Sequence, residues 1–345
     1  MKRNISIFCA VIMLILSVAG CGKSAAVTEI EPEGTPKSAS ASDNSLSIVT
    51  TIFPEYDLVK EILGENPAGA EVAMLLDNGV DLHSYQPTAE DILKIATCDL
   101  FVYVGGESDE WVEDALKEAT NKDMVVVNLL DTLGSLVKEE EVVEGMEAEE
   151  EEEESEEEGE EGEEEGPEYD EHVWLSVKNT EKLCESLTDS ICKIDEENAD
   201  VYKENSASYL AKLDILDKSY EEAVGSSNVN TLLFGDRFPF RYLVDDYGLN
   251  YYAAFVGCSA ETEASFETIT FLAGKVDELS LHSILTIEGT EHKIAETIKE
   301  NTASKDQDIL TMDSMQSTTS EDVKNGATYL SIMESNLEVL KKALK

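Results

Sequence analysis

The chain has 345 residues, a formal net charge of −50 at pH 7 and 42% hydrophobic residues, a length sufficient for two lobes that each have a core. The acidic balance disfavours a nucleic-acid partner, because phosphates would be repelled, and it favours attraction of cations. The sequence contains no nucleophile elbow, phosphate-binding loop, zinc-protease helix or dinucleotide fingerprint, so we expect a protein that is not an enzyme.

The first 45 residues are expected to be a leader and a tether. Two basic residues precede an apolar run from Ile5 to Val18 that is short for a membrane span. The run closes with Val-Ala-Gly-Cys, which is similar to a bacterial lipobox and implies a signal peptide over 1–21 with Cys21 as the lipidated first residue. A cleaved signal with an incidental cysteine is the alternative. Residues 22–45 carry almost no large apolar residue, which predicts a flexible tether.

Strands alternate with helices from residue 46 to 178, which predicts an N-terminal α/β lobe with a mostly parallel sheet covered on both faces. Turn residues and short apolar runs place the strands at 47–51, 72–76, 100–104 and 124–128. The expected helices cover 54–63, 87–96 and 109–119.

An acidic insertion at 139–168 closes this lobe. From Glu139 to Glu171 the chain has about 22 acidic residues and no basic one, leaving about −28 for the remainder. Like charges at this density repel, so we expect disorder across the insertion. It contains no histidine, and a passive spacer or a weak collector of cations both remain open.

Residues 179–225 are expected to form a linking helix. Apolar residues recur at helical spacing from Thr180 to Ala223, a length of about 60 Å as one helix, and Gly225 ends the pattern. A C-terminal α/β lobe then covers 226–345. Its expected strands are 231–234, 251–256, 283–287 and 309–312, and its later helices are 265–279, 291–300 and 321–344.

Two histidines, His83 and His172, indicate a site for a divalent metal ion. His83 follows an apolar run and a turn and precedes a helix that starts near Pro87. Open α/β sheets bind ligands at this end of their strands. One such histidine alone would more simply be a surface turn residue. His172, however, lies between acidic residues and a short apolar strand, and imidazole suits zinc and the later transition metals. His282 and His292 are expected to be solvated.

These stretches resemble the metal-binding lipoproteins of ABC importers for zinc and manganese, the cluster A-I substrate-binding proteins. Leu82-His83-Ser84-Tyr85-Gln86-Pro87 is similar to the Pro-His-x-Tyr-x-Pro-like loop of that family, and Asp170-Glu171-His172-Val173-Trp174-Leu175 to its Asp-Pro-His-Val-Trp-Leu stretch. The residues 53–57, 259–263 and 329–337 agree too, so the resemblance covers nearly all of the chain after Ser45.

The resemblance implies two α/β lobes joined by one long helix, which would limit hinge closure. It also implies a monomeric, lipid-anchored extracytoplasmic receptor that delivers zinc or manganese to a membrane permease. A surface adhesin of the same fold and a metal-dependent hydrolase are alternatives. So is a receptor for a metal chelate such as a siderophore or corrinoid, which Tyr251, Tyr252, Arg237 and Arg241 keep open.

The implied metal ligands are His83, His172 and, from the second lobe, Asp313, for which a turn cap is the alternative role. The family places a fourth ligand, His or Glu, where this chain has Arg237, whose guanidinium cannot ligate. Asp236 is our candidate for the fourth ligand, with Glu288 or a water as competitors. Four cysteines outside the leader are expected to be structural: Cys98, Cys184, Cys192 and Cys258.

Overall fold

The computed structural model describes residues 45–147, 168–259, 263–289 and 291–345. The expected signal peptide, Cys21, the tether up to residue 44 and residues 148–167 of the acidic insertion lie outside these ranges. Within them, no helix is both long and apolar enough to cross a bilayer.

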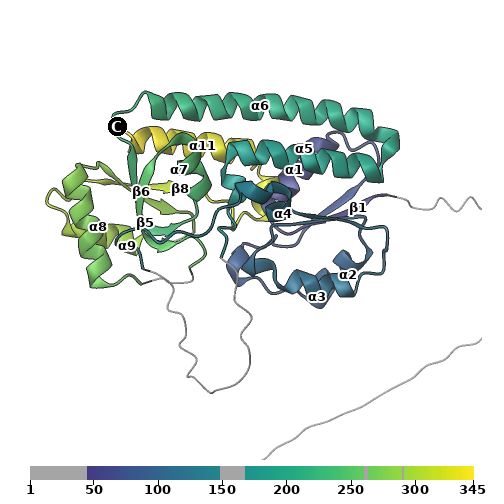
Figure 1. Ribbon diagram of the computed structural model, residues 1–345, viewed down its shortest axis with the longest axis horizontal. Helices are drawn as coiled ribbons and strands as arrows, with labels where there is room; N and C mark the ends of the chain where they lie inside the picture. The colour runs from purple at the N-terminus through teal and green to yellow at the C-terminus, as the bar shows by residue number, and fades with distance from the viewer. Residues whose placement is uncertain (1–44, 148–167, 260–262, 290) are drawn as a thin grey trace, which may run out of the picture. The chain divides into compact units, whose positions relative to one another are not determined.

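Two four-stranded parallel sheets form the two lobes (Figure 1). In the first lobe the order is β2 (Glu71–Met74), β1 (Ser47–Thr50), β3 (Leu100–Tyr103) and β4 (Val125–Asn128). In the second it is β6 (Asn250–Val256), β5 (Thr231–Phe238), β7 (Ser283–Ile287) and β8 (Asp308–Met312). The eight strands predicted for the two sheets are confirmed, and β5 continues to Phe238 instead of ending at Phe234. The chain order reverses beside β1 and β5, so the carboxyl ends of the central strands are the expected ligand positions.

Helices flank both sheets. The first lobe has α1 (Phe53–Leu63), α2 (Ala89–Thr97), α3 (Trp111–Lys117) and α4 (Leu129–Leu133), with α4 absent from the prediction. The second has α7 (Arg241–Tyr247), α8 (Phe266–Leu279), α9 (Lys293–Asn301), α10 (Ser320–Lys324) and α11 (Tyr329–Ala343). Hydroxyl caps start several of them, because a side-chain oxygen satisfies a free backbone N–H in the first turn. Thr88 at α2, Ser265 at α8 and Thr328 at α11 are examples.

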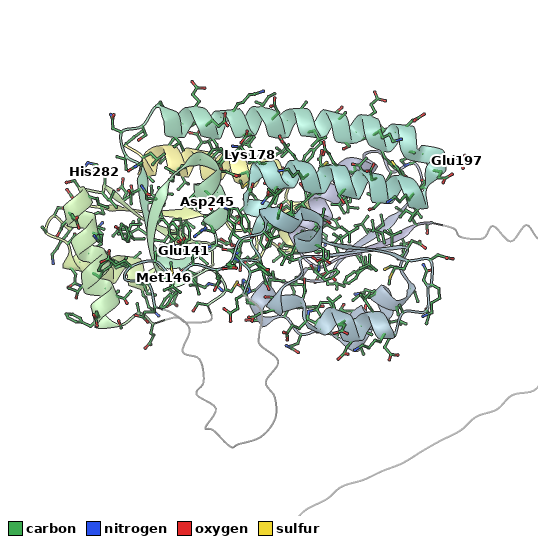
Figure 2. All side chains as sticks on the ribbon, viewed as in Figure 1. Glu141, Met146, Lys178, Glu197, Asp245 and His282 are labelled. Carbon is green, nitrogen blue, oxygen red and sulfur yellow. The ribbon has the colours of Figure 1, made fainter. Side chains whose placement is uncertain are left out.

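The expected single linking helix over 179–225 is two helices, α5 (Val177–Ile194) and α6 (Ala199–Gly225), separated by the short 3₁₀ helix η5 (Glu196–Asn198). Glu197 lies at this turn, and the two helices run back along each other (Figure 2). The break arises at Asp195, whose carboxylate accepts hydrogen bonds from Asn198 Nδ2 and the Tyr202 hydroxyl. Asp and Asn offer such local alternatives to helix hydrogen bonds. A long helix is therefore confirmed, but it is α6 alone.

Contacts that cross between the lobes hold them together. α6 packs against α1, α5 and α11, so it runs along both lobes (Figure 1). The Tyr220 hydroxyl donates to the Met333 carbonyl at 2.7 Å, and the backbone N–H of Tyr329 donates to the Asp57 carboxylate at 2.8 Å. Trp174 Nε1 donates to the Ser314 carbonyl at 2.9 Å. One hydrophobic cluster consequently contains buried residues of both lobes, and a second cluster lies within the second lobe, with residues of α8 and α9.

Two further local expectations are wrong. The stretch Val173–Leu175, expected as a strand, is the 3₁₀ helix η4. The expected helix over 321–344 is interrupted between α10 and α11, where Gly326 has φ +100°. Only glycine adopts such a conformation without strain, so the Asn325-Gly326 pair ends α10.

The acidic insertion is not disordered at its described ends. Glu139 and Tyr169 form an isolated antiparallel β-bridge. The Glu140 N–H donates to the Glu168 carbonyl, and the Asp170 N–H donates to the Lys138 carbonyl. We call this paired entry and exit, 138–140 with 168–170, the neck. After the neck, the chain reaches the second lobe, where Glu141 and Met146 lie beside the sheet (Figure 2). Glu147 forms an isolated parallel β-bridge with Phe255.

Candidate metal site

His83 is held at the end of the first sheet by its own loop and by the loop after β3. Asp81 caps the 3₁₀ helix η1 (Leu82–Ser84) by accepting the His83 N–H at 3.1 Å. The ring nitrogen Nδ1 lies 2.7 Å from the Ser108 hydroxyl and 3.5 Å from Glu171 Oε2. The side chain is only 9% exposed. With Nδ1 so engaged, Nε2 is the nitrogen that faces the site.

His172 precedes η4 and is fully buried. Asp170 Oδ1 accepts from both the backbone N–H and the Nδ1 of His172, each at 2.9 Å. A carboxylate on the far nitrogen of an imidazole fixes its tautomer and raises its basicity, as it does in many metal sites. The Nε2 of His172 is therefore also directed into the site.

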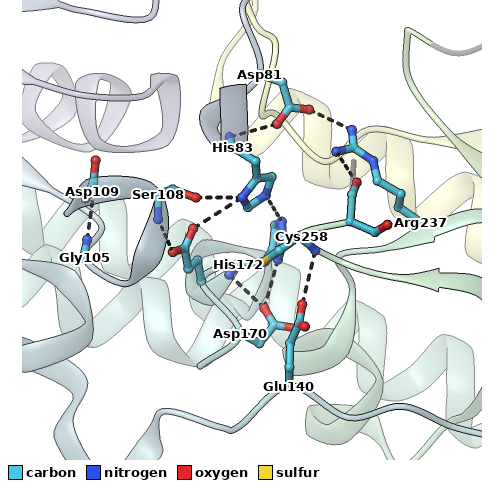
Figure 3. Close-up of polar contacts among 12 residues, drawn as sticks. Asp81, His83, Gly105, Ser108, Asp109, Glu140, Asp170, His172, Arg237 and Cys258 are labelled. Atoms are coloured by element: carbon cyan, nitrogen blue, oxygen red, sulfur yellow. Dashed lines mark hydrogen bonds and ion pairs between the residues drawn. The ribbon is translucent and has the colours of Figure 1, made fainter. Parts of the chain in front are cut away.

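The two imidazoles converge. The Nε2 atoms of His83 and His172 lie 3.2 Å apart, with the rings inclined at 57° (Figure 3). Two zinc–nitrogen bonds of about 2.0–2.1 Å at a tetrahedral angle place the two nitrogens about 3.4 Å apart. The pair thus has the spacing of two ligands of one ion, and the role of the two histidines as ligands stays a prediction.

The two rings differ in pKa. Burial, and then the charge of His172, lowers the pKa of His83 to about 3, so His83 is neutral. Burial also acts to lower the pKa of His172, but the carboxylate of Asp170 outweighs it and raises the pKa above its ordinary value. The Nε2 of neutral His83 thus faces the Nε2–H of His172, and a metal ion at that place would displace this proton.

Two second-lobe residues cover the histidines. Arg237 Nη2 lies 2.7 Å from Asp81 Oδ2, and its Nη1 donates to the Ser259 carbonyl at 3.3 Å. The side-chain amide of Gln316 is assigned with its nitrogen toward Asp81, because the opposite orientation places its oxygen against acceptors only; its oxygen then accepts from His172 Nε2 at 2.8 Å. Arg237 cannot serve as a metal ligand, because its guanidinium stays protonated and has no lone pair to offer.

Cys258 joins the two histidines. One ring nitrogen from each and the Cys258 sulfur all lie within 4.8 Å of one another (Figure 3). Within the described ranges, this is the group of three metal-binding side chains that the structure brings together. Cys258 was expected to be structural. It lies directly after β6, at the same end of the sheet as Asp236 and Arg237.

The carboxylates expected from the second lobe are outside this group. Asp313 Oδ1 accepts the Met315 N–H at 2.8 Å. Asp236 accepts the N–H groups of Arg237 and Ile287, and Glu288 accepts both the N–H and the hydroxyl of Ser314 at 2.7 Å. Each carboxylate is thus bonded within its own lobe. Burial, followed by the charge of Asp313, raises the pKa of Glu288 to about 7.

A small acidic pocket opens beside His83 and Cys258. Its volume is about 180 Å³, and four glutamates line it: Glu107, Glu140, Glu168 and Glu171. Burial raises the pKa of Glu171 to about 7, although hydrogen bonds from Ser108 oppose the rise. Acidic walls raise the local concentration of cations at such an entrance.

Comparison with known proteins places this geometry in context. Residues 48–343 match the family model of ZnuA, described as the periplasmic component A of a zinc-uptake complex. The chain belongs to this family. It is 32% identical over 300 residues to the zinc-binding lipoprotein AdcA of Streptococcus pneumoniae, covering 87% of this chain but 56% of that relative. The high-affinity zinc uptake system protein ZnuA of Bacillus subtilis is 31% identical over 329 residues, 95% of this chain and 94% of that protein.

The fold agrees with a solved member of the ZnuA family. The Zn(II)-bound ZnuA-like domain of S. pneumoniae AdcA superposes with a TM-score of 0.67 at 28% identity, covering 87% of this chain and 99% of that domain. The two parallel sheets and the long helix of this chain are therefore those of the ZnuA-like fold.

Proposed function

We propose that this protein is the extracytoplasmic receptor of an ABC importer, that it captures zinc at His83 and His172, and that it passes the ion to a membrane permease. Membership of a zinc-uptake family supports the proposal, as do the zinc-related names of the S. pneumoniae and B. subtilis relatives. Lipid anchoring through Cys21 and a monomeric state belong to the same proposal and rest on the sequence.

The observation that carries the proposal is the 3.2 Å separation of the Nε2 atoms of His83 and His172. Each imidazole has its other nitrogen engaged, by Ser108 or by Asp170. The two Nε2 atoms therefore face each other, and imidazole nitrogen is a ligand that suits zinc. A dication between the two nitrogens satisfies both.

The acidic pocket favours an ion over a chelate as cargo. Sites for organic ligands usually measure about 300–1,000 Å³, whereas the pocket beside His83 measures about 180 Å³. Membership of a family described by zinc uptake also supports a receptor role over that of a metal-dependent hydrolase. An adhesin role could accompany metal capture and stays a prediction of the sequence.

Thermal unfolding with and without zinc tests the proposal. An ion that binds only the folded state raises the free energy of unfolding by about 2.7 kcal/mol when its concentration is a hundred times Kd, so the Tm should rise. The wild-type Tm should rise with zinc, and the double variant His83→Ala, His172→Ala should lose this rise. Excess Ca²⁺ in all samples occupies the acidic side chains, which prefer hard cations.

His282→Ala is the matched control, because His282 is exposed and outside the site. It should keep the full zinc response. An absent response in the wild type, or one that persists in the double variant, would contradict the proposal.

A further inference from the structure

We propose that Cys258 is a third ligand of this site, its thiolate completing a two-histidine, one-cysteine set, and that this sulfur makes the site select zinc over manganese. The inference rests on the proposed function, because it requires an ion held by His83 and His172. On binding, the Cys258 thiol loses its proton to solvent and the sulfur forms a bond to the metal.

The distances fit this ligand set. In a tetrahedral zinc site, bonds of about 2.0–2.1 Å to nitrogen and 2.3 Å to sulfur place nitrogen and sulfur about 3.5 Å apart. The ring nitrogens and the Cys258 sulfur already lie within 4.8 Å of one another. A shift of the sulfur by about 1 Å, within the reach of one side-chain rotation, completes the triangle.

The loop that carries Cys258 is held against the histidines from three sides. The Cys258 N–H donates to Glu140 Oε1 at 3.2 Å. Arg237 donates to the Ser259 carbonyl at 3.3 Å. Gly257 packs so closely on His172 that a Cβ there would lie 2.9 Å from the ring carbon Cε1. The sulfur is therefore positioned by its surroundings rather than left on a free loop.

Among the described residues of the second lobe, no carboxylate belongs to the group. Asp313, Asp236 and Glu288 are each bonded to backbone N–H groups of their own lobe. Cys258 is thus the residue through which the second lobe would reach the ion. An ion bound to His83, His172 and Cys258 would join the two lobes.

The donor set decides which metal is preferred. Thiolate and imidazole suit zinc, whereas manganese prefers carboxylate, carbonyl and water oxygens. Two neutral imidazoles and one thiolate leave a zinc complex with a single positive charge. Three protein ligands also leave one position open, beside which the Gln316 amide lies.

Cobalt substitution tests the sulfur bond directly. Co²⁺ in a sulfur-containing site shows a sulfur-to-metal charge-transfer band in the near ultraviolet beside its visible d–d bands. The wild type and Cys192→Ser, a half-buried cysteine outside the site, should show both, under reducing conditions. Cys258→Ser should keep d–d bands and lose the charge-transfer band. Its zinc affinity should fall by at least the roughly 10–100-fold that losing an outer-shell partner costs, and its preference for zinc over manganese should shrink.

The outcomes separate the two proposals. A charge-transfer band that persists in Cys258→Ser, or bound cobalt without that band in the wild type, overturns the role of Cys258 and leaves zinc capture intact. A wild type that binds neither cobalt nor zinc overturns both. If Cys258→Ser does not fold, alkylation of the wild type by N-ethylmaleimide decides the matter. Zinc should slow modification of Cys258 but not of Cys192, and equal rates with and without zinc would refute the assignment.

Discussion

The guanidinium of Arg237 in the second lobe and the carboxylate of Asp81 in the first form an ion pair 2.7 Å long, and the same carboxylate accepts the His83 N–H. Both side chains are partly buried, at 18% and 25% exposure. Burial raises the pKa of Asp81, but the charge and hydrogen bond of Arg237 outweigh this and hold it below its usual value. The two charges act on the site with opposite sign.

Removing either partner should change zinc affinity in opposite directions. The charge of Arg237 opposes the rise in the pKa of His172, and the charge of Asp81 opposes the fall in the pKa of His83. Each charge should act on a bound cation in the same direction as on a proton. Arg237→Gln should tighten zinc binding by about three- to tenfold and Asp81→Asn should weaken it by a similar factor. Calorimetric titration measures both. The two shifts should shrink as salt is raised, and shifts of the same sign would contradict this account.

Asp170 orients His172, and its charge should be needed for tight binding. Asp170→Asn retains an oxygen for the His172 N–H but loses the negative charge beside Nδ1. Losing such an outer-shell carboxylate typically lowers metal affinity by about 10–100-fold. Asp214→Asn, an exposed change of the same charge on α6, is the control and should leave the zinc titration unchanged. Equal affinities for Asp170→Asn and the wild type would show that the carboxylate is dispensable.

Asp57 should make stability depend on pH away from the metal site. Burial raises its pKa to about 6, although the Tyr329 N–H that it accepts opposes the rise. The folded state therefore holds more protons than the unfolded state between about pH 4 and pH 6, and stability from this group falls as the pH rises through that window. Asp57→Asn keeps the acceptor and cannot ionise.

The wild type and Asp57→Asn should differ in how the free energy of unfolding changes with pH. Asp57→Asn should match the wild type near pH 4 and exceed its free energy of unfolding above pH 6 by up to roughly 3 kcal/mol. Urea unfolding of the metal-free proteins at several pH values measures the difference. A constant offset across the window would show that Asp57 does not titrate there.

Gly257 should tolerate no side chain. A Cβ at this position would lie 2.9 Å and 3.0 Å from two atoms of the His172 ring and 3.0 Å from the Phe238 carbonyl. Gly257→Ala should therefore cost about 1–3 kcal/mol of unfolding free energy and weaken zinc binding by moving the imidazole. Gly274→Ala in α8, where a Cβ meets nothing within 4 Å, should instead add about 0.5–1 kcal/mol. Denaturant unfolding of both variants provides the comparison.

The strands and the two histidines were predictable because local sequence determines them. Short apolar runs ending in turn residues define the eight strands. His83 follows one of them at the ligand-binding edge of a parallel sheet. Breaks inside long polar helices were harder to predict. The turn at Asp195 depends on hydrogen bonds to Asn198 and Tyr202, and neither proline nor glycine marks it.

The second-lobe side of the site depended on turn geometry that the sequence does not reveal. Met315 adopts a left-handed conformation, with φ +64°, and its N–H binds the carboxylate of Asp313. The same turn brings Gln316 to His172. Gln316 was not predictable, because a single residue in this conformation decides which side chain of the loop faces the histidines.

The neck separates the site from whatever length of chain lies beyond it. Lys138 and Asp170, on the two sides of the acidic insertion, are hydrogen-bonded to each other. This bond helps to fix the position of His172 independently of the insertion. In general, the entropic cost of closing an inserted segment grows only slowly with the length of that segment. Glu147 still pairs with Phe255 of the second lobe, so a reporter inserted after Glu147 should leave both imidazoles in place.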